Sequence, residues 1–458
     1  MKGDIHFLHD YLREFRLPRE DGQVILTSDL KTSCDLLTVE GREYPRYTNE
    51  FWTARQRQAS RLHEISYRAC FKPQLPRFFI SLLTDPGDIV YDPFTGRGTT
   101  PIEAALMGRN IIANDINPLS RILTEARLCP PDISDIRARL YSPEDLPGEC
   151  EIDLSMFYHP DTLKTICSLR AYLHKRQTEG TTDDTDRWIR MIATNRLTGH
   201  SPGFFSVYTL PPNQAVTPDR QIKINRQRNQ VPPYRDVREI ILKKTRSLLQ
   251  DLDQKQQDNL ADAARNAVFL SRDARDTGCI SDSSVQLTVT SPPFLDIVQY
   301  STDNWLRCWF NHIDAEEIAR TITMSRRLAD WEKIMASVFS ELFRITKPGG
   351  FVAFEVGEIR NGSLRLDEHV IPLGTRAGFT CITVVINRQD FTKTANIWGV
   401  GNMKTGTNTN RIVIFTKKGG DSGELPVPAG GIMPHCITGV PSGNQTQKAL
   451  LSPLHHMQ

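Results

Sequence analysis

Four consecutive residues, Ser291-Pro292-Pro293-Phe294, have the types and the order that could hold a planar molecule carrying an amino group. They follow residues 284–289, an apolar, β-branched run typical of a buried strand. Two successive prolines cannot donate to a sheet ladder, so the chain must leave the sheet here with stiff φ angles and bare carbonyls. The Ser291 hydroxyl and the Pro292 carbonyl could then accept hydrogen bonds from the amine while the Phe294 ring stacks on its face. A Pro-Pro pair alone more often marks a plain exit from a strand, so the functional interpretation depends on a second motif.

The second motif is a strand, a glycine-rich turn, a helix and another strand that ends on an acid. Residues 89–92 are a short apolar strand, the turn contains Gly96 and Gly98, residues 101–107 are apolar and helical, and residues 110–115 end on Asp115. The glycines let the backbone approach a ligand closely, and a carboxylate at this strand end can accept both hydroxyls of a ribose. The pattern predicts cofactor binding more strongly than a tight turn with no ligand, although the third glycine of the dinucleotide fingerprint is absent.

Composition sets the broad class. The chain has 458 residues, of which 39% are hydrophobic, so it can bury a large core. A net charge of +2 carries no global signature of polyanion binding. The nine cysteines show no CxxC pair and no metal-ligand spacing, which favours reduced thiols and predicts no metal site. The start of the chain lacks the apolar core of a signal peptide, and no apolar run is long enough for a membrane helix, so we expect a cytoplasmic protein.

Further strands are predicted at 268–270 and 351–356, with a closing antiparallel hairpin of 381–386 and 411–415. Residues 331–345 are predicted to form an amphipathic helix that stops at a Lys-Pro-Gly-Gly turn. We therefore divide the chain into an N-terminal extension (1–50), a catalytic domain (51–130 and 262–417), a largely helical insertion (131–261) and a disordered tail (418–458).

The insertion contains the one strong local bias of charge. Between residues 219 and 246 there are nine Lys and Arg against three acids. A solvated helix face and a surface that contacts phosphate are equally compatible with this excess taken alone. The candidate phosphate contacts are Arg226, Arg228, Lys243 and Lys244.

Taken together, the two motifs resemble those of the S-adenosylmethionine-dependent DNA amino methyltransferases. Residues 92–100 resemble the cofactor motif of that family, and residues 290–294 resemble its catalytic motif. Ser-Pro-Pro-aromatic is associated there mainly with the 4-amino group of cytosine, and Asp-Pro-Pro-Tyr more often with the 6-amino group of adenine. The resemblance covers roughly residues 50–417. One departure is the order, because many cytosine-amine enzymes place the catalytic motif before the cofactor motif.

The resemblance implies a Rossmann-like methyltransferase fold, which is α/β with a mostly parallel seven-stranded sheet and an antiparallel C-terminal hairpin. It also implies the cofactor S-adenosylmethionine and two sets of site residues. The catalytic set is Ser291, Pro292, Pro293 and Phe294; the cofactor set is Lys72, Asp92, Phe94, Gly96, Gly98, Thr99, Thr100, Asp115 and Asp273. Because a paired base is inaccessible inside a duplex, the target base would be flipped out.

The expected activity is therefore site-specific methylation of cytosine N4 in double-stranded DNA, within a restriction-modification system. The expected protein is a DNA-associated monomer in a prokaryotic cytosol, accompanied by a restriction endonuclease that acts separately. Three alternatives stay open: an adenine-N6 DNA methyltransferase, an RNA base methyltransferase, and an inactive regulator that binds cofactor and DNA.

Overall fold

The fold is taken from a computed structural model of the chain. It describes residues 5–17, 31–53, 59–68, 70–142, 148, 150–210, 215–293, 300–321, 327–359, 364–392 and 405–419. Phe294 and residues 420–458 of the predicted tail lie outside the described residues.

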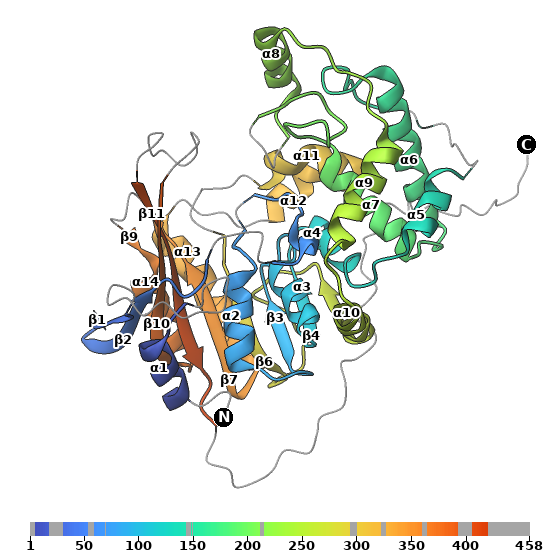
Figure 1. The fold of residues 1–458 in the computed structure, drawn as a ribbon. Helices are drawn as coiled ribbons and strands as arrows, with labels where there is room; N and C mark the ends of the chain where they lie inside the picture. Colours follow the sequence, from blue (N-terminus) through green and yellow to red (C-terminus); the bar gives the residue numbers. More distant parts are fainter. Residues whose placement is uncertain are drawn as a thin grey trace, which may run out of the picture.

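A nine-stranded sheet organises the molecule, in the order β1-β2-β10-β11-β7-β6-β3-β4-β5 (Figure 1). Its strands are β1 (Ser33–Val39), β2 (Arg42–Asn49), β3 (Ile89–Asp92), β4 (Asn110–Asn114), β5 (Val268–Leu270), β6 (Val285–Thr290), β7 (Thr346–Val356), β10 (Thr380–Thr392) and β11 (Thr405–Thr416). A separate two-stranded ribbon consists of β8 (Glu358–Ile359) and β9 (Leu364–Arg365).

The centre of the sheet, from β7 through β6, β3 and β4 to β5, is parallel. The hairpin of β10 and β11 is antiparallel and joins this centre through an antiparallel pairing of β11 with β7. The α/β class and the C-terminal hairpin are thus confirmed.

The predicted strand number was too low, because the sheet has nine strands instead of seven. The N-terminal extension folds into the hairpin β1–β2, and β2 pairs in parallel with β10, with Val385 opposite Tyr47. Most side chains of β1 are exposed, so its residues lack the apolar alternation by which a strand is recognised in a sequence.

Helices cover both faces of the sheet and create two cores (Figure 1). On one face lie α1 (Ile5–Glu14), α2 (Gln74–Leu83) and α3 (Thr99–Leu106); on the other lie α13 (Leu328–Ile345) and α14 (Leu366–Arg376). The apolar stripe of α13, which includes Met335, Phe339 and Leu342, is buried against the second face. The short 3₁₀ helix η3 (Arg61–His63) contacts α3.

The insertion is helical, as predicted. It contains α5 (Ile133–Leu140), α6 (Pro160–Thr178), α7 (Asp184–Arg196), α8 (Pro218–Arg228) and α9 (Val237–Leu249). The capping box of Asp183 and Asp186 marks the start of α7. Next in the chain, α10 (Gln254–Asn266) packs on α3 and β4 of the sheet domain.

Helices α11 (Tyr300–Phe310) and α12 (Ala315–Thr321) come after the Ser-Pro-Pro segment, yet they lie beside the insertion in Figure 1. Arg170 of α6 donates to the Trp309 carbonyl at 3.0 Å, and Asn311 donates to Thr194 at 2.9 Å. We call α5–α9 together with α11 and α12 the helical lobe. Helix α4 (Leu119–Glu125) contacts both β4 and α7 and so connects this lobe to the sheet.

Within the described ranges, no helix has the length and apolar content needed to cross a bilayer. The same ranges contain no cluster of three His, Cys, Asp or Glu side chains with the geometry of a metal site.

Candidate functional site

The two motifs of the sequence meet at the carboxyl ends of adjacent parallel strands, β3 and β6. The Thr290 hydroxyl, at the end of β6, donates to Asp92 Oδ1 at 2.6 Å. The Thr100 hydroxyl, in the first turn of α3, donates to the Val289 carbonyl at 3.1 Å. Ser291 is therefore held next to the glycine-rich turn, at the sheet edge where parallel α/β folds bind ligands.

Asp92 is the buried centre of this junction. Its Oδ1 atom also accepts a hydrogen bond from the Phe94 amide at 3.1 Å. Burial raises the pKa of Asp92 to about 7, and the hydrogen bonds from Thr290 and Phe94 oppose that shift. Near neutral pH this carboxyl can therefore be protonated or ionised, and its Oδ1 atom contacts both the turn and the residue before the Ser-Pro-Pro segment.

The turn between β3 and α3 requires both of its glycines. Gly96 has φ +54° and Gly98 has φ +81°, a region that favours glycine. A Cβ atom at Gly98 would overlap the Thr124 hydroxyl and lie 2.8 Å from Arg127 Nη2. Arg127 is fully buried and donates to the Arg97 carbonyl in the middle of the turn. Arg127 thus fixes the backbone of the turn from the side of the core.

Asp115 follows β4 directly and fixes the other side of the turn. Its Oδ2 atom accepts from the Gly96 amide at 2.8 Å, and its Oδ1 atom accepts from the Asn117 amide at 2.9 Å. Burial raises the pKa of Asp115 to about 6. Each carboxylate oxygen has a second lone pair, so two acceptor sites remain. Asn117 Nδ2 is buried without a hydrogen-bond partner in the described part of the chain.

The segment before α2 forms a wall beside the turn. A Cβ atom at Gly96 would lie 3.7 Å from the Tyr67 ring and 3.8 Å from Cys70 Sγ. Arg97 donates to the Ile65 carbonyl at 3.0 Å, which ties this wall to the turn. Lys72 lies in the same segment, where burial and then the charge of Arg97 lower its pKa.

Glu355 is a candidate site residue that the sequence alone did not reveal. It lies near the end of β7, which pairs with β6, and it is buried with 6% of its surface exposed. Burial raises the pKa of Glu355, and the nearby Ser291 and Asn410 side chains oppose the shift. The Asn410 donor atom lies 3.0 Å from Glu355 Oε1. An acid inside the apolar run 351–356 was the available signal.

The Ser-Pro-Pro turn is also held from the opposite core. Trp331, at the start of α13, is 3% exposed and its Nε1 donates to the Pro293 carbonyl at 3.2 Å. Pro292 is buried, whereas Ser291 and Pro293 are half-buried. No placement is given for Phe294, which lies outside the described residues.

The other predicted cofactor residues occupy different positions. Phe94 is half-buried against the second core, and Thr99 is buried at the start of α3, where it accepts from Arg97 Nε at 3.2 Å. Asp273 lies in the loop after β5 and pairs with Arg275 at 2.5 Å. The hydrogen bond from Arg275 lowers the pKa of Asp273, so this carboxylate already has a cationic partner.

The predicted DNA contacts do not form a uniform set. Arg226 and Arg228 on α8 are exposed, as is Lys243 on α9. The Lys244 side chain is only 12% exposed and pairs with Glu64 at 3.2 Å. Its charge is neutralised within the fold, so we remove Lys244 from the candidate phosphate contacts.

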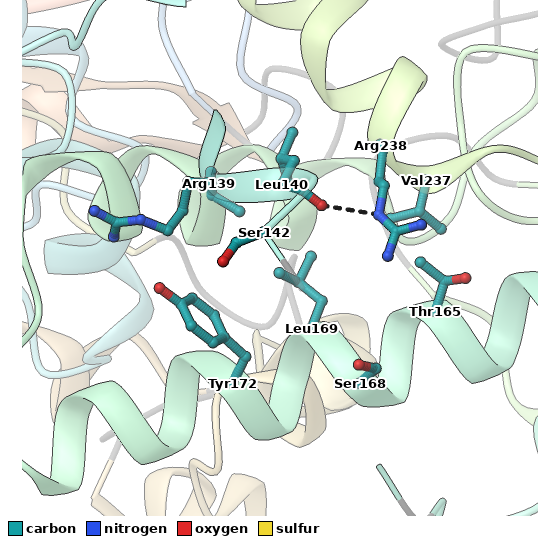
Figure 2. A pocket seen from close by; sticks show the side chains of 10 residues that line it. Arg139, Leu140, Ser142, Thr165, Ser168, Leu169, Tyr172, Val237 and Arg238 are labelled. Atoms are coloured by element: carbon teal, nitrogen blue, oxygen red, sulfur yellow. Dashed lines mark hydrogen bonds between the residues drawn. The ribbon is translucent and has the colours of Figure 1, made fainter. Parts of the chain in front are cut away.

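A cleft of about 40 Å³ lies inside the helical lobe, between α5, α6 and α9 (Figure 2). Arg139 on its wall is paired with Asp183 at 2.7 Å, and Arg238 donates to the Leu140 carbonyl at 2.9 Å. These cations already have partners, and about 40 Å³ has room for only a few water molecules, so we assign the cleft no ligand.

One comparison with known proteins covers the glycine-rich turn. A family model described as DNA methylase matches residues 17–122. The Type II methyltransferase M.MjaII of Methanocaldococcus jannaschii is 38% identical over 71 residues, which are 16% of this chain and 13% of that protein. The Type II methyltransferase M.MvaI of Kocuria varians is 31% identical over 101 residues, which are 21% of either chain. The matches thus span about a fifth or less of these relatives.

Two solved structures are among those that the comparison matched. One is a SAM-dependent methyltransferase of Methanosarcina mazei, with 10% identity, a TM-score of 0.27, and coverage of 74% of this chain and 97% of that chain. The other is a protein of Thermus thermophilus named as a DNA modification methylase and solved with S-adenosyl-L-methionine. It has 22% identity, a TM-score of 0.20, and coverage of 34% of this chain and 56% of that chain.

Proposed function

We propose that this chain transfers a methyl group from S-adenosylmethionine to the 4-amino group of cytosine in duplex DNA, as its similarity to the DNA methylase family suggests. The hydrogen bond from Thr290 to Asp92 carries the proposal, because it brings the glycine-rich turn and the Ser-Pro-Pro segment to one sheet edge. The names of the two curated relatives support a restriction-modification setting, in which an endonuclease would act as a separate protein.

The residues at the turn fit the cofactor. The two unused lone pairs on Asp115 suit ribose hydroxyls, and the unpartnered amide of Asn117 offers a donor beside them. The wall containing Tyr67 and Lys72 would border the methionine part of the ligand. When bound, S-adenosylmethionine supplies an electrophilic methyl group on a sulfonium.

Ser291 and Pro292 would prepare the amine for methylation. The lone pair of an exocyclic cytosine amine is delocalised into the ring, so the amine is a weak nucleophile. Hydrogen bonds from the amine to Ser291 Oγ and the Pro292 carbonyl would favour a tetrahedral nitrogen and localise the lone pair. Glu355 would orient the Ser291 hydroxyl, because the Ser291 side chain is close enough to oppose the rise in the pKa of Glu355.

Serine at this position favours cytosine as the target over adenine. A neutral hydroxyl positions the amine without abstracting a proton before methyl transfer, so the nitrogen releases one proton to solvent after it has been methylated. Ser-Pro-Pro is the form of the motif associated mainly with cytosine. The base would have to leave the duplex first, at a cost of about a few kcal/mol. We assign to Phe294 the role of stacking its ring on the extruded base.

Product analysis tests the assignment. The protein is incubated with S-adenosylmethionine and unmethylated duplex DNA, and the DNA is digested to nucleosides for mass spectrometry. We expect the modified nucleoside N4-methyl-2′-deoxycytidine. N6-methyladenine would overturn the base assignment, and methylation of RNA alone would overturn the DNA assignment.

A serine substitution tests the catalytic role. Ser291→Ala should lower kcat about 100-fold, the effect of removing one positioned hydrogen-bonding group, while cofactor binding by calorimetry persists. Ser284→Ala is the matched control, because Ser284 precedes the other end of β6 and its hydroxyl donates to the Ser281 carbonyl. If Ser291→Ala methylates at the rate of the control, the catalytic assignment is wrong.

A further inference from the structure

Helix α8 lies at the far end of the helical lobe (Figure 1). Its exposed side chains include Arg220, Lys223, Arg226 and Arg228, against the single acid Asp219. We call Arg220, Lys223, Arg226, Gln227 and Arg228 the α8 face. The spacing from 220 to 223 to 227 places these side chains along one side of the helix.

Several cations of the helical lobe outside α8 are neutralised by acids. Elsewhere in the lobe, Arg139 and Arg176 both bind Asp186, Arg170 pairs with Glu151, and Lys244 pairs with Glu64. Within the described ranges, none of the cations on α8 forms an ion pair with an acid of the protein. The α8 face therefore gathers four cations without acid partners on one helix, whereas α9 carries two such cations, Lys243 and Arg246, in the described part of the chain.

The inner side of α8 is locked to the lobe by amide side chains, and Gln221 is its one buried residue. Gln221 Nε2 donates to the Tyr208 carbonyl at 3.1 Å and to Asn225 Oδ1 at 2.8 Å. Gln230 Nε2 repeats both contacts, at 3.0 Å and 2.8 Å. Asn225 in turn donates to the Met156 carbonyl at 2.7 Å.

These hydrogen bonds fix the position of α8, although the helix contributes little to the core. Directional hydrogen bonds fix the orientation of a helix, whereas the burial of apolar side chains explains why a helix is part of a core at all. The guanidinium of Arg228 is stacked 3.9 Å from the centre of the Tyr208 ring, which holds the end of the helix.

The segment after α8 adds exposed apolar groups to the same end of the lobe. Val231 is 83% exposed and Tyr234 is 57% exposed, and Leu210 before the helix is 42% exposed. Cations beside exposed aromatic and aliphatic side chains match the chemistry of a nucleic acid, which presents phosphates next to sugars and bases.

We propose that the α8 face binds the phosphate backbone of the DNA duplex that contains the target base, with Arg220, Lys223 and Arg226 as the phosphate contacts. This inference rests on the proposed function, since it takes DNA to be the substrate. It assigns binding to one helix, adds Arg220 and Lys223 to the predicted contacts, and gives Arg228 the separate role of anchoring the helix on Tyr208.

The salt dependence of DNA binding tests the inference. Each phosphate contact contributes about 0.9 to the slope of log K against log salt concentration. The triple variant Arg220→Gln, Lys223→Gln, Arg226→Gln should therefore lower the slope by about 2.7. Between 50 and 200 mM salt, the loss of affinity should then be about 40-fold smaller than in the unsubstituted protein.

The matched control has the same change in net charge at other surfaces. Lys255→Gln on α10, Lys333→Gln on α13 and Lys418→Gln after β11 also replace three exposed cations. We expect this control to keep the slope and the methylation rate of the unsubstituted protein. An equal decrease of slope in both triple variants would show that the slope depends on net charge alone, and it would overturn the inference.

Two measurements separate this inference from the proposed function. If the unsubstituted protein methylates DNA and the α8 variant keeps its full salt slope, the α8 inference is wrong and the proposed function stands. If the unsubstituted protein neither binds nor methylates DNA, the proposed function fails and the α8 inference fails with it. Circular dichroism of the variant checks that α8 has not unfolded, because Gln is compatible with an exposed helix.

Discussion

The hydrogen bond from Thr290 to Asp92 can be tested through stability as a function of pH. Thr290→Val keeps the shape of the side chain and removes the donor that lies 2.6 Å from the carboxyl. A hydrogen bond to a charged group contributes about 1.5–3 kcal/mol, and one between neutral groups about 0.5–1.5 kcal/mol. The loss in free energy of unfolding should therefore depend on whether Asp92 is ionised.

The direction of the pH effect follows from the pKa of Asp92, which burial raises from 3.8 to about 7. The folded protein binds this proton more tightly than the unfolded chain does. The resulting stability is complete below pH 3.8 and is lost as the pH rises through about 7. Thr290 opposes the shift, so Thr290→Val raises the pKa further and increases the loss at high pH.

Urea denaturation at pH 5.5 and pH 8.5 measures the effect. We expect a loss of about 1 kcal/mol at the lower pH and about 2 kcal/mol at the higher. With a urea m-value of about 3 kcal/mol/M, the second loss moves the midpoint by about 0.7 M.

Thr288→Val is the matched control. Thr288 lies two residues away on the same face of β6 and is fully buried, and its hydroxyl has no hydrogen-bond partner in the described part of the chain. Removing an unsatisfied buried hydroxyl should leave stability unchanged or raise it. Equal losses for the two variants, or a Thr290→Val loss that does not grow with pH, would refute the role of this bond.

The remaining predictions concern Glu355, the glycine turn and Asp115. Glu355→Gln should lower kcat more than tenfold while the KM for S-adenosylmethionine stays within twofold, because its partner is Ser291; a change in KM alone would show a merely structural role. Gly98→Ala should abolish cofactor binding in calorimetry. Gly87→Ala, also at positive φ but in open space, should preserve it. Loss of binding in both variants would mean that backbone strain alone decides, and binding by both would contradict the role of Gly98. Cofactor affinity should rise as the pH increases through about 6, where Asp115 ionises and accepts hydroxyl hydrogen bonds more strongly, and Asp115→Asn should make the affinity independent of pH in this range.

Local chemistry explains why much of the fold was predictable. The strand at 89–92, the turn with Gly96 and Gly98 and the strand to Asn114 form one unbroken βαβ unit. Within such a unit, the apolar periodicity and the positions of glycine and proline indicate the local backbone conformation. The right-handed crossover between parallel strands then fixes how the two strands and the helix assemble. The same reasoning identified the amphipathic helix at 331–345 and the closing hairpin.

Contacts between distant segments decided the rest. Residues 33–49 become strands because β10 has an open edge beside them, and this edge is supplied by residues more than three hundred positions later. Glu355 joins the site through the register of β7 against β6, and Lys244 leaves the set of phosphate contacts through its pair with Glu64. The sequence by itself determined the elements and the chemistry at their ends, because both depend on neighbours in the chain. Only the tertiary structure decided which side chains face one another and which charges are already neutralised, because burial and pairing depend on residues that are close in space and far apart in sequence.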